Sequence, residues 1–260
     1  MATLSGPGVH SGLTCSVSLH RSDGPVTFLR GSGQVPALAG NVSDTAGATS
    51  LKHGGTTVRQ VEHLLAALHI RGWWHGLLIE TTAEELPILD GSSEPWLGLL
   101  DSLGPAPEPP AAFSPSLPLQ LQVNGGSARV EPGPARLTVS IDYPHPLIGR
   151  QTWSGSAADY GQLADARTFG FERDAADLRA RGLALGASTD NCVVFSDTAT
   201  VNPLRSADEP VRHKALDALG DLLLLGRPLQ ASVTIACGSH TLHARLVQQL
   251  WREAGLETAG

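Results

Sequence analysis

The sequence predicts an α+β protein in which the same architecture is built twice. In each half of the chain, segments that alternate like strands come first, and apolar segments with helical spacing follow. Residues 105–118 are dense in proline and alanine, and proline fixes the backbone and removes donors that helices and sheets need. The length of 260 residues is sufficient for two modest domains. We therefore expect domains at 1–104 and 119–260, joined by a linker at 105–118.

The composition argues against several classes of protein. The formal net charge of −7 disfavours a general binder of nucleic acid or of anionic membranes. Purely apolar runs such as Leu222 to Leu225 are far shorter than the ~20 residues that cross a bilayer. The N-terminus lacks the basic start and apolar core of a secretory signal, so we expect a cytoplasmic protein. Cys15, Cys192 and Cys237 are far apart and odd in number, so we expect small buried thiols and no disulfide framework.

The first half is expected to open with strands and to end with helices. Leu13 to Leu19 comes close to strand alternation, and Val26 to Leu29 is a short second strand that would complete a hairpin with it. Residues 31–55 have few large apolar side chains, and no elements are assigned to them. The remaining elements follow in order: a helix at 58–68, a buried strand at 76–80, and a helix at 94–103 that starts through Ser92 or Ser93.

The second half repeats this order, beginning with alternating strands at 119–123 and 135–142. The later elements are, in order, a short helix at 174–181 capped by Gly182, a strand at 192–195, a helix at 208–221, a strand at 231–236 and a last helix after His240. Both halves therefore place their helices after their first strands.

The helix from Asp208 to Asp221 carries an unusual line of polar residues. Asp208 is a suitable N-cap, and Pro210 fits the first turn, where a missing N–H costs nothing. His213, Asp217 and Asp221 then follow at intervals of four residues, which stacks them on one face, roughly 6 Å apart per step. An imidazole and a carboxylate one turn apart can hold a metal ion, although such a pair is more often a simple contact on a helix surface.

A second polar pair interrupts the apolar helix at 58–68. Glu62 and His63 are adjacent, and polar neighbours inside such a run require a reason. If His63 supplied a third metal ligand, Glu62 would lie within reach of a water on the metal, where a general base belongs. Two histidines and one aspartate leave a coordination position open, which is typical of catalytic zinc sites.

Four motifs occur in the chain, at Val61 to Leu68, Pro87 to Ser92, Arg167 to Phe171 and Val211 to Asp221. Together and in this order, they resemble the UDP-3-O-acyl-N-acetylglucosamine deacetylase family, the zinc enzymes of lipid A biosynthesis. The resemblance runs from about Gly8 to the C-terminal helix. It implies hydrolysis of the substrate's N-acetyl group with release of acetate. It also implies two similar domains, each a sheet with a helical layer, that face one another across the active site.

The resemblance further implies the residues of a metal centre and its base. His63, His213 and Asp217 would hold Zn²⁺, and Glu62 would take a proton from the attacking water. Thr168 would donate to the developing oxyanion, as a hydroxyl aimed at negative charge can.

A proton donor is implied as well. His240 would protonate the leaving amine, and Asp221 would orient this histidine and favour its charged form.

The resemblance also implies how the UDP-linked acylated amino sugar is bound. Tyr143 would stack near the uracil ring, although a packing aromatic is an equal alternative, and Lys214 would hold the nucleotide part unless it is an ordinary exposed cation. Phe169 and His10 would lie near the substrate. We expect a monomer without a transmembrane segment, whose contact with a membrane would be peripheral and through the acyl substrate.

A small βαβ-type insert in the second domain is implied around residues 166–195. In the family this insert walls a hydrophobic passage for the fatty acyl chain. The candidates to line it are Leu178, Leu183, Leu185, Val193 and Val194.

Some segments depart from the family's pattern, notably Gly72 to Gly76, with two tryptophans, and Gly238 to His243, where a histidine ends the motif instead of asparagine. One alternative is therefore a divergent zinc deacetylase that acts on another N-acetylated sugar. A second is a non-catalytic binding module of the same fold. A zinc peptidase is a weaker third, because the chain has no His-Glu-x-x-His motif.

Overall fold

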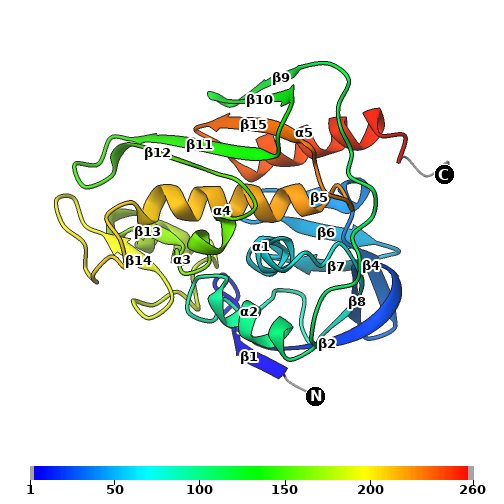
Figure 1. The fold of residues 1–260 in the computed structure, drawn as a ribbon. Coiled ribbons are helices and arrows are strands. Elements are labelled where there is room, and N and C mark those ends of the chain that lie inside the picture. The colour runs from blue at the N-terminus through cyan, green and yellow to red at the C-terminus, as the bar shows by residue number, and fades with distance from the viewer. Residues whose placement is uncertain (1–2, 257–260) are drawn as a thin grey trace.

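The computed structural model describes residues 3–256 and has the expected α+β architecture. Two five-stranded sheets lie on either side of a central group of helices, with α4 and α1 side by side between them (Figure 1). The strands of the first sheet, in spatial order, are β1 (Thr3–Pro7), β2 (Thr14–Pro25), β8 (His75–Thr81), β3 (Thr27–Arg30) and β4 (Gly33–Pro36). Those of the second are β9 (Leu119–Val123), β10 (Gly126–Pro132), β15 (Ala231–Ala236), β11 (Arg136–Tyr143) and β12 (Gly149–Gly155).

The two sheets have the same topology. In each, the strand that comes last in the chain takes the central position, β8 in the first sheet and β15 in the second. Strand β8 is antiparallel to β2 and parallel to β3, and β15 is likewise antiparallel to β10 and parallel to β11. The expected repetition of one architecture therefore extends to strand order and direction. The domain boundaries at 104 and 119 stay a prediction.

The predicted hairpin of the first half is wrong. Strands β2 and β3 do not pair, because β8 lies between them and pairs with both. Alternation along a strand predicts which face is buried but not which strand is its neighbour. Leu77 and Ile79 of β8 are fully buried, as suits a central strand. Strand β1, which was not predicted, covers the outer edge of β2.

The helices match the prediction in number, with shifted ends. They are α1 (Glu62–Arg71), α2 (Glu94–Asp101), α3 (Ala175–Ala180), α4 (Glu209–Leu223) and α5 (His240–Glu253). The helix expected from Val58 starts four residues later, because Gln60 has a φ of 60° and Val58 belongs to a strand. Asp208 is the N-cap of α4, but its carboxylate bonds Arg212 Nε at 3.1 Å instead of the first turn. The remaining elements are the three-stranded sheet of β5 (Val42–Asp44), β6 (Ser50–His53) and β7 (Thr56–Arg59), and the 3₁₀ turns Ala39–Asn41, Tyr160–Leu163 and Glu172–Asp174.

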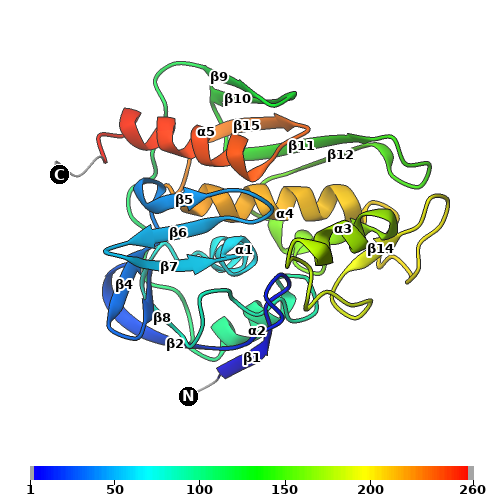
Figure 2. The ribbon, with the colours of Figure 1, turned by 180° about the vertical axis from the view of Figure 1, so that it is seen from behind.

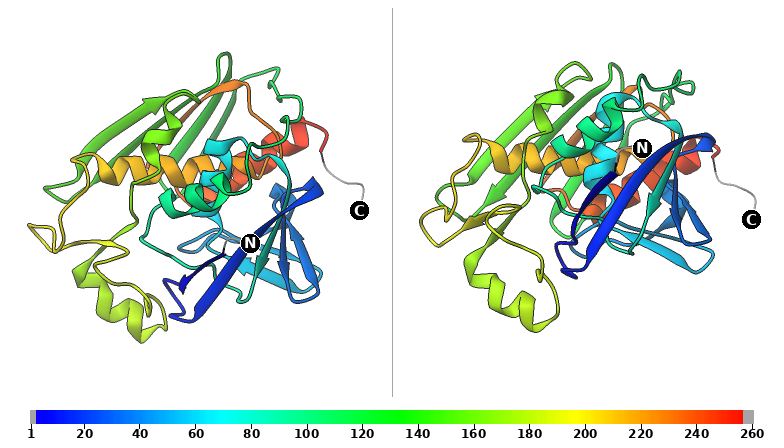
Figure 3. Two further views of the ribbon diagram at one scale, coloured as in Figure 1. Left: turned by 60° about the horizontal axis from the view of Figure 1, so that its bottom comes forward. Right: turned by 90° about the horizontal axis from the view of Figure 1, so that it is seen from below.

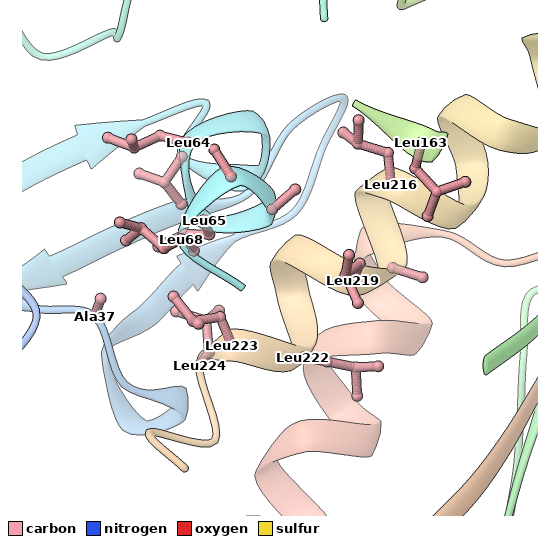
Figure 4. Packing of buried hydrophobic residues seen from close by; sticks show 14 of the residues in the cluster. Ala37, Leu64, Leu65, Leu68, Leu163, Leu216, Leu219, Leu222, Leu223 and Leu224 are labelled. Atoms are coloured by element: carbon pink, nitrogen blue, oxygen red, sulfur yellow. The ribbon is translucent and has the colours of Figure 1, made fainter. Parts of the chain in front are cut away.

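Helices α1 and α4 pack against one another through buried leucines. Leu64, Leu65 and Leu68 of α1 are fully buried beside Leu219 and Leu223 of α4 (Figure 4). Gly220 allows the close approach of the two helices, because a Cβ atom at this position would collide with the carbonyl oxygen of Glu62. This contact sets the distance between the two motif helices.

The insert is present as expected. Strands β13 (Phe169–Phe171) and β14 (Val193–Phe195) pair in parallel, with α3 between them in the chain, and the unit projects at one end of α4 (Figures 2 and 3). Residues 105–118, all of them described, contain no helix or strand and only one isolated bridge, from Phe113 to Leu229. No helix within residues 3–256 is long and apolar enough to cross a membrane.

The expectation of buried thiols holds for Cys15 but is wrong for Cys237. Cys237 is exposed because it begins the turn after β15, with a φ of 49°. Cys192 is intermediate, and all three cysteines are unpaired.

Candidate active site

Helices α1 and α4 bring together the three predicted metal ligands. Asp217 Oδ1 lies 3.3 Å from His213 Nε2 and 3.8 Å from His63 Nε2. The three side chains are buried, and one ligand atom of each lies within 4.8 Å of the others. The rise of one helical turn places His213 over Asp217, and the α1–α4 contact brings His63 to them.

The chemistry of this cluster fits a cation. Within the described residues, Asp217 Oδ1 is buried and has no hydrogen-bond partner, while Oδ2 accepts from Lys214 Nζ at 2.8 Å. His213 Nδ1 lies 3.2 Å from the carbonyl oxygen of Ala166, to which it donates, so that Nε2 is left as a ligand atom. Two imidazole nitrogens and one orphaned carboxylate oxygen therefore converge on one point, as in an open metal site.

The electrostatics keep the three ligands in the forms that bind metal. Burial, reinforced by the neighbouring His213, lowers the pKa of His63 to about 3, so this imidazole is neutral. Burial alone would raise the pKa of Asp217, but His213 and Lys214 hold it well below its usual range. Neutral imidazoles and an ionised carboxylate are the states that coordinate zinc.

Glu62 lies next to the cluster with a pKa suited to proton transfer. Its Oε2 accepts from the backbone N–H of Thr49 at 3.0 Å, and its Oε1 is 3.9 Å from His240 Nε2. Burial raises the pKa of Glu62 to about 7, with the charge of His240 opposing and that of Asp217 adding to the rise. A carboxylate that titrates near neutrality can both take up and release a proton.

His240 lies opposite Glu62 and is the first residue of α5. The side chain of Ser239 caps this helix by accepting from Leu242 N–H at 3.3 Å. His240 Nδ1 is 2.8 Å from Asp221 Oδ2. Although burial lowers the pKa of His240, the charge of Asp221 outweighs it and raises the value to about 9. The imidazole is therefore a protonated acid at neutral pH.

Sequence reasoning missed two residues of this site, Thr49 and His243. The Thr49 hydroxyl donates to Asp221 Oδ1 at 2.6 Å and lies 3.1 Å from His240 Nδ1. His243 Nδ1 is 2.9 Å from Asp221 Oδ2. A signal existed for His243, since it stands where the motif was expected to end in asparagine. No signal marked Thr49, which lies 172 positions from Asp221.

Thr168 lies at the entry to the insert, and hydrogen bonds hold its backbone on both sides. Its N–H donates to the carbonyl of Gly91 at 2.8 Å, and its own carbonyl accepts from Val193 N–H at 2.8 Å. The preceding Arg167 donates through Nε at 2.8 Å to Glu209, a buried carboxylate at the start of α4. The role expected for the Thr168 hydroxyl stays a prediction.

Three of the predicted substrate residues gather beside His213. The ring centre of Phe169 is 6.3 Å from that of His213 and 5.5 Å from that of Tyr143. Lys214 Nζ lies 5.8 Å from the centre of the Phe169 ring. His10 has other neighbours. Its backbone N–H donates to Glu85 at 2.7 Å, its carbonyl accepts from Leu185 N–H at 3.0 Å, and its ring faces Gly47.

The insert lines an open cavity of about 300 Å³, mostly apolar but with Glu172, Arg179, Ser188 and Thr189 in its lining. Two of the five predicted lining residues, Leu178 and Val194, line it. Val193 does not line this cavity, because it alternates to the core side of β14 and is 1% exposed, and neither does Leu185, which is 55% exposed. Leu183 does not line this cavity either. The lining instead includes Phe171, Ala175, Ala184, Ala187 and Cys192.

Comparisons with known proteins agree with this arrangement. A family model described as UDP-3-O-acyl N-acetylglycosamine deacetylase matches residues 1–252. A UDP-3-O-acyl-N-acetylglucosamine deacetylase of Thermosynechococcus vestitus is 40% identical over 260 residues, which cover 96% of this chain and 91% of the relative. A protein of the same name from Nitratidesulfovibrio vulgaris is 39% identical over 97% of this chain and 86% of the relative. Another, from Bdellovibrio bacteriovorus, is 38% identical over 95% of this chain and 86% of the relative.

Proposed function

This chain belongs to the UDP-3-O-acyl N-acetylglycosamine deacetylase family, and we propose that its metal centre is a zinc ion held by His63, His213 and Asp217. The activity is hydrolysis of the N-acetyl group of UDP-3-O-acyl-N-acetylglucosamine, a step of lipid A biosynthesis. The observation that carries the proposal is the orphaned oxygen of Asp217, which faces both imidazoles from a buried position. When bound, Zn²⁺ supplies Lewis-acid chemistry by polarising the amide carbonyl and acidifying water.

The residues around the triad divide the proton transfers between them. Glu62 takes a proton from water as its oxygen attacks the acetyl carbon, which suits a carboxylate with a pKa of about 7. The Thr168 hydroxyl donates a hydrogen bond to the oxyanion that forms. His240, held by Asp221 in its charged form, gives a proton to the sugar nitrogen as the C–N bond breaks. Acetate and the free amine result.

Tyr143, Phe169 and Lys214 are proposed to bind the nucleotide part of the substrate. Their rings and ammonium group lie together beside His213, and this combination suits a uracil ring and a negatively charged phosphate. The acyl chain is proposed to enter the apolar cavity of the insert, and His10 to contact the substrate from the Val9–Gly12 turn. The cytoplasmic location, the monomeric state and the two-domain division stay predictions.

The experiment is acetate release by zinc-loaded protein from UDP-3-O-acyl-N-acetylglucosamine, beside UDP-N-acetylglucosamine without the acyl chain. We expect turnover of the acylated sugar, and a fall in kcat of at least about 10²-fold in Glu62→Gln, since general-base catalysis contributes roughly that much. Equal turnover of both sugars would contradict the assignment of the insert cavity to the acyl chain. Absence of turnover by protein with verified zinc would contradict the assigned activity.

A further inference from the structure

The carboxylate of Asp221 has more hydrogen-bond partners than one histidine requires. Oδ2 is shared by Nδ1 of His240 at 2.8 Å and Nδ1 of His243 at 2.9 Å, while Oδ1 accepts from the Thr49 hydroxyl at 2.6 Å. Asp221 and Thr49 are buried, and His243 is 2% exposed. The four residues come from three segments: Thr49 from the loop before β6, Asp221 from α4, and both histidines from α5.

The direction of these bonds follows from the charge of Asp221. Burial opposes its ionisation, but His240 holds its pKa at about 2, so the carboxylate can only accept. Both imidazoles must therefore carry hydrogen on Nδ1, and the threonine hydroxyl must donate. With donors on both oxygens, the carboxylate cannot rotate about its last torsion without breaking one of these bonds in a place that water does not reach.

We propose that Thr49 and His243 are positioning residues, which fix Asp221 so that His240 presents Nε2 toward Glu62 and the leaving nitrogen. The inference rests on the proposed roles of His240 and Glu62. Neither Thr49 nor His243 touches a metal ligand through the bonds described. His243 acts on His240 through Asp221, and Thr49 acts both through Asp221 and through its own contact of 3.1 Å with His240 Nδ1. Such outer partners hold the reacting groups of an active site in register.

Two further contacts fit a positioning role. The backbone N–H of Thr49 binds Glu62 Oε2 at 3.0 Å, so one residue contacts both the base and the carboxylate behind the acid. On the other side, the chain at Gly238 packs directly on His243, since a Cβ atom there would stand 2.6 Å from Nε2 of that imidazole. The backbone is thus shaped to admit the imidazole of this chain.

Paired variants test the proposal. His243→Asn keeps an N–H group bonded to Cγ, as Nδ1 is, whereas His243→Leu keeps the shape and removes the donor. Thr49→Ser keeps the hydroxyl, whereas Thr49→Val removes it and leaves the backbone bond to Glu62. We expect His243→Leu and Thr49→Val to lower kcat about tenfold or more with KM unchanged, as for other orienting partners. We expect His243→Asn and Thr49→Ser to stay within about threefold of wild type. Melting temperatures measured alongside separate this loss from unfolding.

A spectroscopic readout makes the test independent of turnover. In ¹⁵N-labelled protein, the Nδ1 proton of His240 reports on its bond to Asp221, and we expect its signal to move in Thr49→Val and His243→Leu but not in Thr49→Ser. Suppose that the wild type is active and that Thr49→Val and His243→Leu leave both kcat and the His240 signal unchanged. This result would overturn the positioning role alone. If the wild type is inactive but the His240 signal still moves in the two variants, the catalytic roles are overturned while the positioning of His240 stands.

Discussion

Gly220 in α4 packs against the carbonyl oxygen of Glu62 in α1, leaving no room for a side chain. This contact joins the helix that carries His213 and Asp217 to the helix that carries His63. The geometry of the proposed metal triad therefore depends on a glycine that has no proposed part in the chemistry.

Gly220→Ala is expected to destabilise the protein by about 1–3 kcal/mol, because an added methyl group in a packed interface forces the backbone apart. It should also weaken zinc binding. The control is Gly98→Ala in α2, where an added Cβ meets no atom within 4 Å. The control should be neutral or up to about 1 kcal/mol more stable, because alanine favours helix. Denaturant unfolding and zinc titration of both variants check this; equal effects at the two glycines would contradict it.

Glu209→Gln tests the hydrogen bonds that hold Arg167, the residue before Thr168. Glu209 accepts from Arg167 Nε at 2.8 Å and from the backbone N–H of Arg205 at 2.7 Å. Replacing the buried carboxylate by an amide of the same shape should cost about 1–3 kcal/mol near neutral pH. Chemical denaturation gives this difference in free energy of unfolding.

The difference should also depend on pH with a defined sign. Burial raises the pKa of Glu209, but the bonds from Arg167 outweigh it and hold the pKa below its ordinary value of 4.5. A depressed pKa contributes stability above the unfolded value, and this contribution is lost as pH falls through the folded value. The cost of Glu209→Gln should therefore shrink below pH 4.5. A cost that stays constant down to acid unfolding would show that the charge of Glu209 is irrelevant.

Leu178→Trp should shorten the insert cavity and make the enzyme sensitive to acyl-chain length. Each methylene that the cavity no longer buries is worth about 0.8 kcal/mol, or roughly a fourfold loss in kcat/KM. Substrates with short chains should be affected little. Leu185→Trp is the control, because Leu185 is exposed and does not line the cavity. A uniform loss across chain lengths would contradict the assignment.

Much of the fold, and the grouping of the three proposed metal ligands, follow from local sequence patterns. The interval of four residues sets His213 over Asp217 regardless of the rest of the fold, and the adjacent Glu62 and His63 stand out in an apolar helix. Local patterns predicted the positions of seven strands but not their neighbours in the sheets, as β8 between β2 and β3 shows. Strand neighbours depend on tertiary packing, which short patterns do not contain.

The missed parts of the site arise from contacts between distant segments. Thr49 lies in a loop of small residues, and only the packing of that loop against α4 and α5 brings its hydroxyl to Asp221. Val193 and Val194 are equivalent as sequence, and the pleat of β14 decides which of them faces the cavity. Cys237 is exposed because it adopts a positive φ in a turn. A cysteine in the sequence does not indicate such a backbone conformation.

The most direct test of the central claim compares two carboxylates one turn apart on α4. Zinc bound per chain is measured by equilibrium dialysis for wild type, Asp217→Asn and Asp221→Asn, together with acetate release. We predict one zinc ion per chain in wild type and in Asp221→Asn, loss of tight zinc binding in Asp217→Asn, and low turnover in both variants. Zinc retained in Asp217→Asn as in wild type, or lost equally in Asp221→Asn, would contradict the assignment of His63, His213 and Asp217 as the metal site.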